Sequence, residues 1–288
     1  MKPADALLMV DGALPMRVIG LHGSTAHARD DWVADEVPLA LEYNGIAYAV
    51  MLASPLDLHD FALGFSLSEG LLDSPSELYG VDEVWGDLGL TLQLRVASAA
   101  AVRLRERRRA IAGRTGCGLC GVDSLSQVVR TLPALLPGAP VAPQAICRGM
   151  SELTSLQTLH HATGAVHAAA WCAADGQVQV LREDVGRHNA LDKLIGALAR
   201  ARVSDAERRA GFVAITSRAS FEMVQKAASA GMSMLAAVSA PTALAVRLAQ
   251  SSGLTLLGFA RGQKMAVYAD AGRLVAAMST VFPTRDMT

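Results

Sequence analysis

Two cysteines in a glycine-rich stretch are the residues of this chain best suited to chemistry. Residues 113–122 read GRTGCGLCGV, which places Cys117 and Cys120 two residues apart among four glycines. Glycine lets the backbone take positive φ and lets another molecule approach the sulfurs closely. Five arginines lie just upstream, between positions 103 and 109, and nearby cations lower the pKa of a thiol. The stretch therefore predicts an accessible, nucleophilic sulfur.

Three other interpretations of the cysteine pair are open. A structural zinc site usually needs two such pairs, and the remaining cysteines, Cys147 and Cys172, have no matching spacing. A thioredoxin-like redox pair begins a helix after a strand, whereas here a charged segment precedes the glycines and Gly121 follows. Idle cysteines in a turn would be unusual, because free cysteines favour buried apolar sites. Sulfur handling is the favoured interpretation, and redox chemistry is the second.

Length and composition indicate a globular protein with a large core. The chain has 288 residues, 51% of them hydrophobic, and a formal net charge of −1. Two domains are expected for this length, and the near-neutral charge gives no field that would attract nucleic acid. No apolar run approaches the roughly 20 residues of a membrane-spanning helix, and the N-terminus lacks the pattern of a signal peptide. We expect a cytoplasmic protein with reduced thiols that binds neither nucleic acid nor membrane.

The first third of the chain predicts a small α+β unit. Residues before about Asp30 show no regular periodicity and are expected to form an arm with turns. Asn44-Gly45 is the dipeptide typical of a two-residue hairpin turn, and apolar runs flank it on both sides. The expected elements are a hairpin over 37–43 and 46–52, a helix from Ser54-Pro55 to about Gly70, and strands over 81–85 and 90–96.

After a proline-rich linker, short apolar strands alternate with helices. Four prolines between 133 and 143 break the chain. The alternation that follows predicts an α/β fold with a mixed, mostly parallel sheet. The expected helices cover 151–161, the segment after Asp184, 221–230 and 241–250, and the expected strands cover 165–172, 178–181, 212–216, 232–238, 254–260 and 265–269.

Three polar loops follow strands of this predicted sheet. In an open α/β sheet, ligands bind beyond the carboxyl ends of the strands, where helix N-termini present free N–H groups. The loops combine hydroxyls with cations, which favours a phosphate-bearing ligand, although each serine taken singly is better explained as a helix cap. Neither a Walker A motif nor GxGxxG occurs. The candidate binding residues are Thr216, Ser217, Arg218, Ser239, Arg261 and Lys264.

A second polar cluster surrounds His188. Asp184, His188 and Asp192 recur every four residues, so they are expected to share one face of a helix. A histidine between two carboxylates could carry protons or orient a ligand. The aspartates have simpler explanations, a helix cap and a solvated charge. We interpret His188 as a residue that lines the site.

Four motifs in order make the sequence resemble one family. They are GRTGCGLCG at 113–121, TGAVHAA at 163–169, DVGRHNALDK at 184–193 and TSRAS at 216–220. Together they resemble the FdhD family, sulfurtransferases needed to activate formate dehydrogenase. The similarity covers most of the chain from about Asp35. Four motifs in this order are far more specific than a single CxxC.

The resemblance implies a fold, a homodimer and a reaction. Sulfur would pass from a cysteine desulfurase to the bis-molybdopterin guanine dinucleotide molybdenum cofactor, with Cys117 carrying the persulfide and Cys120 assisting. GDP-like nucleotides would mimic the ends of this cofactor. The expected domains are a small α+β N-terminal domain over 1–112, the CxxC loop and linker over 113–142, and a cytidine-deaminase-like cofactor-binding domain over 143–288. The cofactor-binding segment of the family matches Phe259, Ala260, Arg261, Gly262, Gln263 and Lys264.

Two functions of other classes remain as alternatives. A zinc nucleoside deaminase needs HxE and a later PCxxC, and the sequence contains neither. A non-enzymatic chaperone of formate dehydrogenase that binds guanine nucleotide would explain the polar loops but would leave the cysteine pair without a role. Zinc analysis separates the first alternative from a sulfurtransferase, and a sulfur-transfer assay separates the second.

Overall fold

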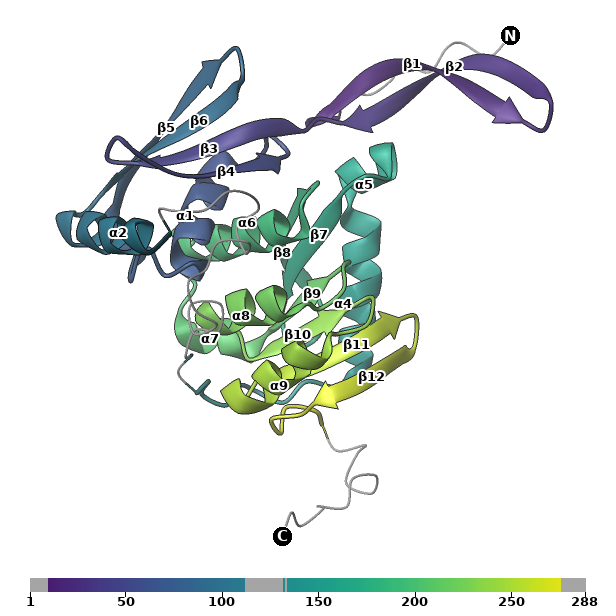
Figure 1. Cartoon of the computed structure of the whole chain (residues 1–288). Helices are drawn as coiled ribbons and strands as arrows, with labels where there is room; N and C mark the ends of the chain where they lie inside the picture. Colours follow the sequence, from purple (N-terminus) through teal and green to yellow (C-terminus); the bar gives the residue numbers. More distant parts are fainter. Residues whose placement is uncertain (1–9, 112–131, 133, 276–288) are drawn as a thin grey trace.

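Three β-sheets and the helices packed on them make up the described chain. The computed structural model describes residues 10–111, 132 and 134–275. A two-stranded hairpin comes first, a four-stranded sheet follows, and a six-stranded sheet forms the C-terminal half (Figure 1). Within these ranges, no helix is long and apolar enough to cross a membrane.

The hairpin of β1 (Ala13–His22) and β2 (Thr25–Ala34) projects away from the rest of the molecule (Figure 1). The expectation of an irregular arm is wrong here, because the two strands pair antiparallel along their whole length. Most of the hairpin packs on no core, so its sequence lacks the alternation that marks a half-buried strand. Its exposed apolar side chains are Leu14, Met16, Ile19 and Leu21.

The four-stranded sheet confirms the predicted Asn44-Gly45 hairpin. Its order is β4-β3-β6-β5, and Asn44 and Gly45 have φ of 47° and 81°, the left-handed values that a two-residue type I′ turn requires. The inner face packs against helix α1 in one apolar cluster. The strands are β3 (Val37–Tyr43), β4 (Ile46–Ala53), β5 (Leu78–Gly86) and β6 (Gly89–Val96).

Helix α1 (Leu58–Ser68) begins later than Ser54-Pro55. Its N-cap is Asp57 with φ 51°, so the turn before the helix includes the proline. The helix ends near Gly70, as expected: its last residue is Ser68, its C-cap is Glu69, and Gly70 follows with φ 61°. A 3₁₀ turn and a helix rich in arginine complete this half: η1 (Pro75–Glu77) and α2 (Ser98–Ile111).

The six-stranded sheet is mixed, with the order β12-β11-β10-β9-β7-β8. Strands β9, β10 and β11 run parallel to one another, which gives two parallel pairs, and the other three pairs of the sheet are antiparallel. The expectation of a mostly parallel sheet is therefore wrong, because the first two strands enter as a hairpin. The strands are β7 (His167–Cys172), β8 (Val178–Asp184), β9 (Phe212–Ile215), β10 (Met234–Ala237), β11 (Thr255–Arg261) and β12 (Lys264–Ala269).

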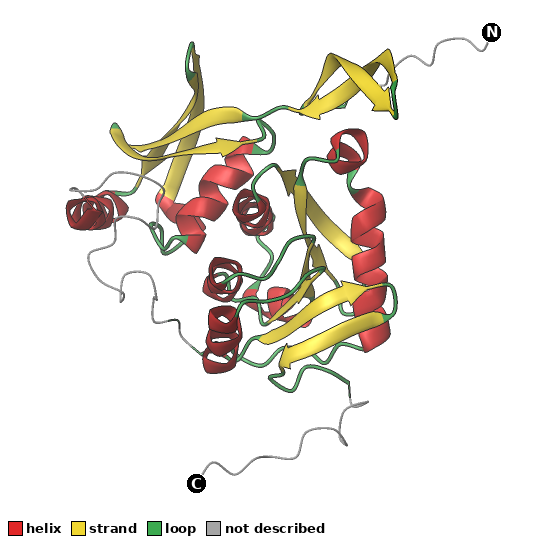
Figure 2. Ribbon diagram, turned by 45° about the vertical axis from the view of Figure 1, so that its right-hand side comes forward, coloured by secondary structure: helices red, strands yellow, loops and turns green. Residues whose placement is uncertain are grey.

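Helices cover both faces of this sheet (Figure 2). Helix α4 (Pro143–Leu156) packs on one face, and α6 (Arg187–Arg200), α8 (Phe221–Ser229) and α9 (Ala243–Ser252) pack on the other. The single helix expected over 151–161 is wrong: α4 begins eight residues earlier, and a break at Gln157 separates it from α5 (Thr158–Thr163). Helix α9 begins after Pro241, with Thr242 as its N-cap, and α7 (Asp205–Ala210) precedes β9.

The contact between α1 and α6 joins the two larger sheets. Gly64 and Gly196 let the helices approach so closely that a Cβ on Gly64 would lie 1.7 Å from the Asp192 carbonyl oxygen. Charges are buried beside this contact: Asp60 accepts hydrogen bonds from Arg182 and Arg200. The mixed α/β architecture is thus confirmed, while the cytidine-deaminase-like assignment and the division into residues 1–112, 113–142 and 143–288 stay predictions.

Candidate functional site

Several strands of the six-stranded sheet end or begin at the same edge. Because β9, β10 and β11 are parallel, their carboxyl ends share this edge. Strand β7 begins here, since Ala169 pairs with Ile215, and β8 ends here, since His167 pairs with Asp184. Helices α6 and α8 begin directly after these strand ends. We call this edge the sheet mouth and define it as residues 167, 184–188, 216–222, 238–242 and 259–264.

The loop after β9 is fixed by hydrogen bonds to neighbouring backbone. The Thr216 N–H donates to the Ala168 carbonyl at 3.1 Å, and the Ala168 N–H donates to Thr216 Oγ1 at 2.9 Å. Ser217 is buried, and its hydroxyl donates to the Arg218 carbonyl at 3.1 Å. Thr216 and Ser217 therefore shape the loop. The exposed Arg218 is the side chain of this loop that is free to meet a ligand, since no described residue forms an ion pair with it.

The turn from β11 to β12 carries the most unusual backbone of the sheet mouth. Phe259 has φ 52°, a value that a bulky residue rarely adopts, and the residue is 50% exposed. The pairing of β11 with β12 shifts register between Gly258 and Arg261, so a bulge lies at the phenylalanine. The Phe259 N–H donates to the Ser239 carbonyl at 3.3 Å, which joins two of the predicted loops.

Arg261 and its neighbours differ in whether their side chains or only their backbone atoms are exposed at the sheet mouth. The Arg261 Nε–H donates to the Val238 carbonyl at 3.1 Å, an anchor that leaves the two terminal nitrogens of the guanidinium for other partners. Ala260 is buried in the core, so only its backbone is available to a ligand. Gly262 has φ 56° and forms the turn, and Gln263 and Lys264 are exposed.

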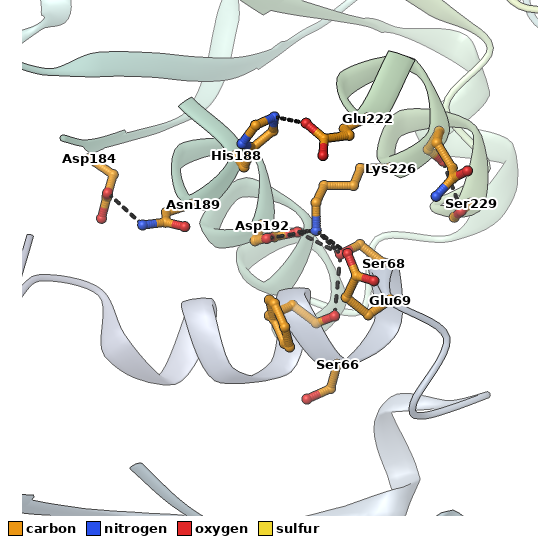
Figure 3. A network of polar contacts seen from close by, with 12 residues as sticks. Ser66, Ser68, Glu69, Asp184, His188, Asn189, Asp192, Glu222, Lys226 and Ser229 are labelled. Carbon is orange, nitrogen blue, oxygen red and sulfur yellow. Dashed lines mark hydrogen bonds and ion pairs between the residues drawn. The ribbon is translucent and has the colours of Figure 1, made fainter. Parts of the chain in front are cut away.

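His188 lies at the start of α6 and faces α8 (Figure 3). Its Nε2 is 2.7 Å from Glu222 Oε2, and both side chains are about two-thirds buried. The polar contact with His188 holds the pKa of Glu222 below its usual value. The histidine therefore has a partner in Glu222, which sequence reasoning did not single out.

The prediction that Asp184, His188 and Asp192 share one face of a helix is wrong, because Asp184 is not on the helix. That residue ends β8, before α6 begins, and it is fully buried. Its carboxylate lies 2.7 Å from Lys193 Nζ and accepts hydrogen bonds from the backbone N–H groups of Ser54 and Gly186. Asp184 thus fixes the start of α6 to the N-terminal half, and the N-cap of that helix is Gly186.

Asp192 is also structural rather than a solvated charge. It is fully buried, and its carboxylate accepts from Ser68 Oγ at 2.5 Å and from Lys226 Nζ at 2.9 Å (Figure 3). Burial opposes the charge on Lys226, but the nearby carboxylates of Asp192 and Glu69 outweigh it and raise the pKa of the lysine. Burial raises the pKa of Asp192 as well, and the charge of Lys226 and the hydrogen bond from Ser68 oppose that rise. His188–Glu222 and Asp192–Lys226 are successive contacts between α6 and α8, four residues apart on each helix.

Three further polar residues lie at the mouth. Burial, and then the charge of Arg187, lower the pKa of His167, so this imidazole is neutral at neutral pH. Arg187 Nε and Ser220 Oγ are shielded from solvent, yet neither has a hydrogen-bond partner among the described residues. His167 and Arg187 lie within the family motifs, but nothing in their local sequence spacing distinguishes them as site residues.

The predicted sulfur centre, Cys117 and Cys120, lies outside the described residues. Of the other cysteines, Cys172 is fully buried, and burial raises the pKa of its thiol to about 12, so it stays protonated at neutral pH. In the arginine-rich segment, Arg103 is paired with Asp73 and Glu77. Within the described part of the chain, no three His, Cys, Asp or Glu side chains are grouped to hold a metal ion.

The family follows from comparison with known sequences. The chain belongs to the FdhD/NarQ family, whose model matches residues 34–275. A relative from Variovorax paradoxus, named sulfur carrier protein FdhD, is 56% identical over 274 residues, which cover 95% of this chain and 98% of the relative. A protein of the same name from Bordetella petrii is 55% identical over 249 residues, covering 86% and 88% of the two chains.

A solved structure supports the fold. A protein of Desulfotalea psychrophila, provisionally assigned as a formate dehydrogenase accessory protein, superposes with a TM-score of 0.70. The alignment covers 91% of this chain and 99% of that one, at 22% sequence identity. At this identity the likeness establishes the fold alone.

Proposed function

We propose that this protein is a sulfurtransferase that carries sulfur for the activation of formate dehydrogenase. The observation that carries the proposal is the 56% identity, over 95% of the chain, to a protein named sulfur carrier protein FdhD. The chain also contains a glycine-flanked cysteine pair of the kind that such chemistry needs. A deeply buried thiol such as that of Cys172 could not serve, because its raised pKa disfavours the thiolate.

In the proposed reaction, Cys117 is the sulfur acceptor. Its thiolate attacks the outer sulfur of a persulfide on a cysteine desulfurase; the donor S–S bond breaks, and the donor cysteine leaves as a thiolate. No external oxidant is needed, because a persulfide is consumed at one cysteine and formed at the other. Cys120 assists, either by relaying the sulfur or by releasing it through a disulfide with Cys117. The sulfur then passes to the bis-molybdopterin guanine dinucleotide cofactor of formate dehydrogenase, which is the substrate.

The sheet mouth is the proposed site for the guanine nucleotide ends of this cofactor. Phe259 offers an exposed aromatic face, held by a rarely adopted backbone conformation, and such outliers concentrate at functional sites. The free ends of Arg218 and Arg261 suit phosphate oxygens. The shielded donors Arg187 Nε and Ser220 Oγ would gain acceptors from a bound pyrophosphate.

The partners and setting belong to the same proposal. A cysteine desulfurase supplies the sulfur, formate dehydrogenase receives the product, and the protein works as a homodimer in the cytoplasm. The names of the relatives support the connection with formate dehydrogenase. A nucleotide-binding chaperone is the remaining alternative, since the sheet mouth would serve it equally well.

Mass spectrometry after incubation with a cysteine desulfurase and cysteine tests the sulfur step. We expect the peptide that contains Cys117 to gain the mass of one sulfur atom, and Cys117→Ala to lose both this adduct and the activation of formate dehydrogenase. Cys147→Ala is the matched control and should behave as wild type. Activation by Cys117→Ala at the wild-type level would favour the chaperone.

Thermal melting with GDP tests the nucleotide site. A ligand that binds only the folded state raises Tm by mass action, and Arg261→Ala should weaken GDP binding by about tenfold or more, as expected for one hydrogen bond to a charged group. Cys117→Ala should keep the full shift. Equal shifts in wild type and Arg261→Ala would place the nucleotide elsewhere.

A further inference from the structure

A cavity of about 620 Å³ lies far from the sheet mouth, between β5, α1 and the C-terminal end of α6. This volume falls in the usual range for small-molecule sites. Leu63, Val81 and Val203 give it apolar walls, and Arg202 and Arg208 add positive charge. Helix α6 begins at the sheet mouth and ends at this cavity, and its 14 residues span about 21 Å. The two sites are therefore separate.

The arginines around the cavity differ in how far their charge is neutralised. Arg200 also lines the cavity, but its Nη1 lies 2.7 Å from the buried Asp60 carboxylate. Arg208 pairs with Asp205. Arg202 has no ion-pair partner among the described residues, and it is exposed. One guanidinium at the wall is therefore available to an anion.

The backbone of Arg202 is also unusual. Helix α6 ends in a Schellman motif: the Arg202 N–H donates to the Ala199 carbonyl at 3.1 Å, and the Val203 N–H donates to the Leu198 carbonyl at 3.0 Å. Arg202 occupies the position after the C-cap, with φ 56°. Glycine is the usual residue there, because any side chain makes this left-handed conformation less favourable.

Other helices of the chain follow the usual rule. The left-handed residues that end α1, α5, α8 and α9 are all glycines: Gly70, Gly164, Gly231 and Gly253. Only α6, among the helices with such an ending in the described ranges, uses a residue with a side chain. Since arginine destabilises this turn relative to glycine, its presence indicates that the side chain has a use outside the turn.

We propose that this cavity binds an amphipathic anion, a small molecule with an apolar body and one carboxylate or phosphate group. The apolar body packs against Leu63, Val81 and Val203, and the oxyanion accepts hydrogen bonds from the Arg202 guanidinium. Arginine suits both oxyanions because its planar fork of N–H groups matches their geometry. This site is independent of the sulfur centre and of the nucleotide site.

Fluorescence titration of the full chain with 1-anilinonaphthalene-8-sulfonate tests the site, because this probe has an apolar body and one anionic group. N-phenyl-1-naphthylamine is the matched probe without the charge. We expect Arg202→Gly to weaken binding of the sulfonate by about tenfold or more and binding of the neutral probe by less than about twofold. The same substitution should raise Tm by roughly 1–4 °C, because glycine suits the turn.

Arg247→Ala is the control for net charge, since Arg247 is exposed on α9 and does not line the cavity. It should bind both probes as wild type does. Decanoate and hexyl phosphate, added as competitors, distinguish a carboxylate ligand from a phosphate ligand. Displacement of the sulfonate by either one supports the proposal. Displacement by neither, or equal sulfonate affinity of wild type and Arg202→Gly, would overturn it.

Discussion

The N-terminal hairpin exposes apolar side chains, whereas the contact between α1 and α6 buries charged ones. Ile19 and Leu21 of the hairpin are 72% and 77% exposed. Beside this contact, Asp184 at the end of β8 and Lys193 of α6 lie 2.7 Å apart with no exposed side-chain area. From hydrophobicity alone, the apolar side chains of the hairpin would be expected in the interior and the charged side chains at the surface.

The difference shows where each region obtains its stability. A buried ion pair depends on both partners, because either one alone would be an uncompensated charge in a medium of low polarity. An isolated two-stranded hairpin is at best marginally stable in water, and exposed apolar patches often mark surfaces that bind another protein. The helix contact is thus completed within the chain, while the outer part of the hairpin is suited to an external partner.

The largest effect is expected from breaking the buried ion pair. Lys193→Met removes the ammonium and leaves the Asp184 carboxylate buried and unpaired, which should lower the free energy of unfolding by about 3–5 kcal/mol. Urea unfolding measures the loss. Lys264→Met, at an exposed position, is the control and should change stability by less than about 0.5 kcal/mol. The double variant Asp184→Asn with Lys193→Met should recover part of the loss; no recovery would mean that the charge is not the cause.

A smaller loss is expected from separating α1 and α6. In Gly64→Ala the new Cβ would lie 1.7 Å from the Asp192 carbonyl oxygen, so the helices must move apart, at a cost of about 1–3 kcal/mol. Gly86→Ala is the matched control, because its Cβ meets nothing closer than 3.9 Å. Urea unfolding measures both variants. Equal free energies of unfolding for Gly64→Ala and Gly86→Ala would show that the close approach of the two helices does not contribute to stability.

The smallest effect is expected in the hairpin. Ile19→Glu changes a side chain that is 72% exposed, so the free energy of unfolding should shift by less than about 0.5 kcal/mol. Leu41→Ala, at a fully buried position of β3, should by contrast cost about 2–5 kcal/mol. Thermal melts at several protein concentrations measure both. A large loss for Ile19→Glu would show that another surface covers this side chain.

Sequence reasoning succeeded where the signal is local. Asn44-Gly45 encodes its own turn, and Gly70 and Gly253 end helices near the expected positions because glycine favours the left-handed conformation there. The polar loops after β9, β10 and β11 also lie at one edge of the sheet, as their order in the chain predicts. These features need only a few neighbouring residues to be recognised.

The errors concern features that distant residues decide. The direction of β7 depends on its pairing with β9, and the direction of β8 on its pairing with β7, which no periodicity reveals. The burial of Asp184 depends on Lys193 and on the Ser54 backbone, 130 residues earlier. The left-handed backbone of Phe259 follows from a bulge in its pairing with β12. Sequence patterns assign residues to the site, but tertiary contacts decide what each residue does there.

The order in which a ribosome releases the chain gives the α1–α6 contact a further consequence. Asp60 is buried in the finished protein, yet its partners Arg182 and Arg200 are synthesised 122 and 140 residues later. At 5–20 residues per second, that interval lasts roughly 7–28 s. During this time α1 cannot settle into its final surroundings, because a buried carboxylate without its cation is unfavourable. Until α6 emerges, the side of α1 that carries Asp60 and Gly64 therefore stays uncovered, while the apolar side of α1 can already pack on the four-stranded sheet of the N-terminal half.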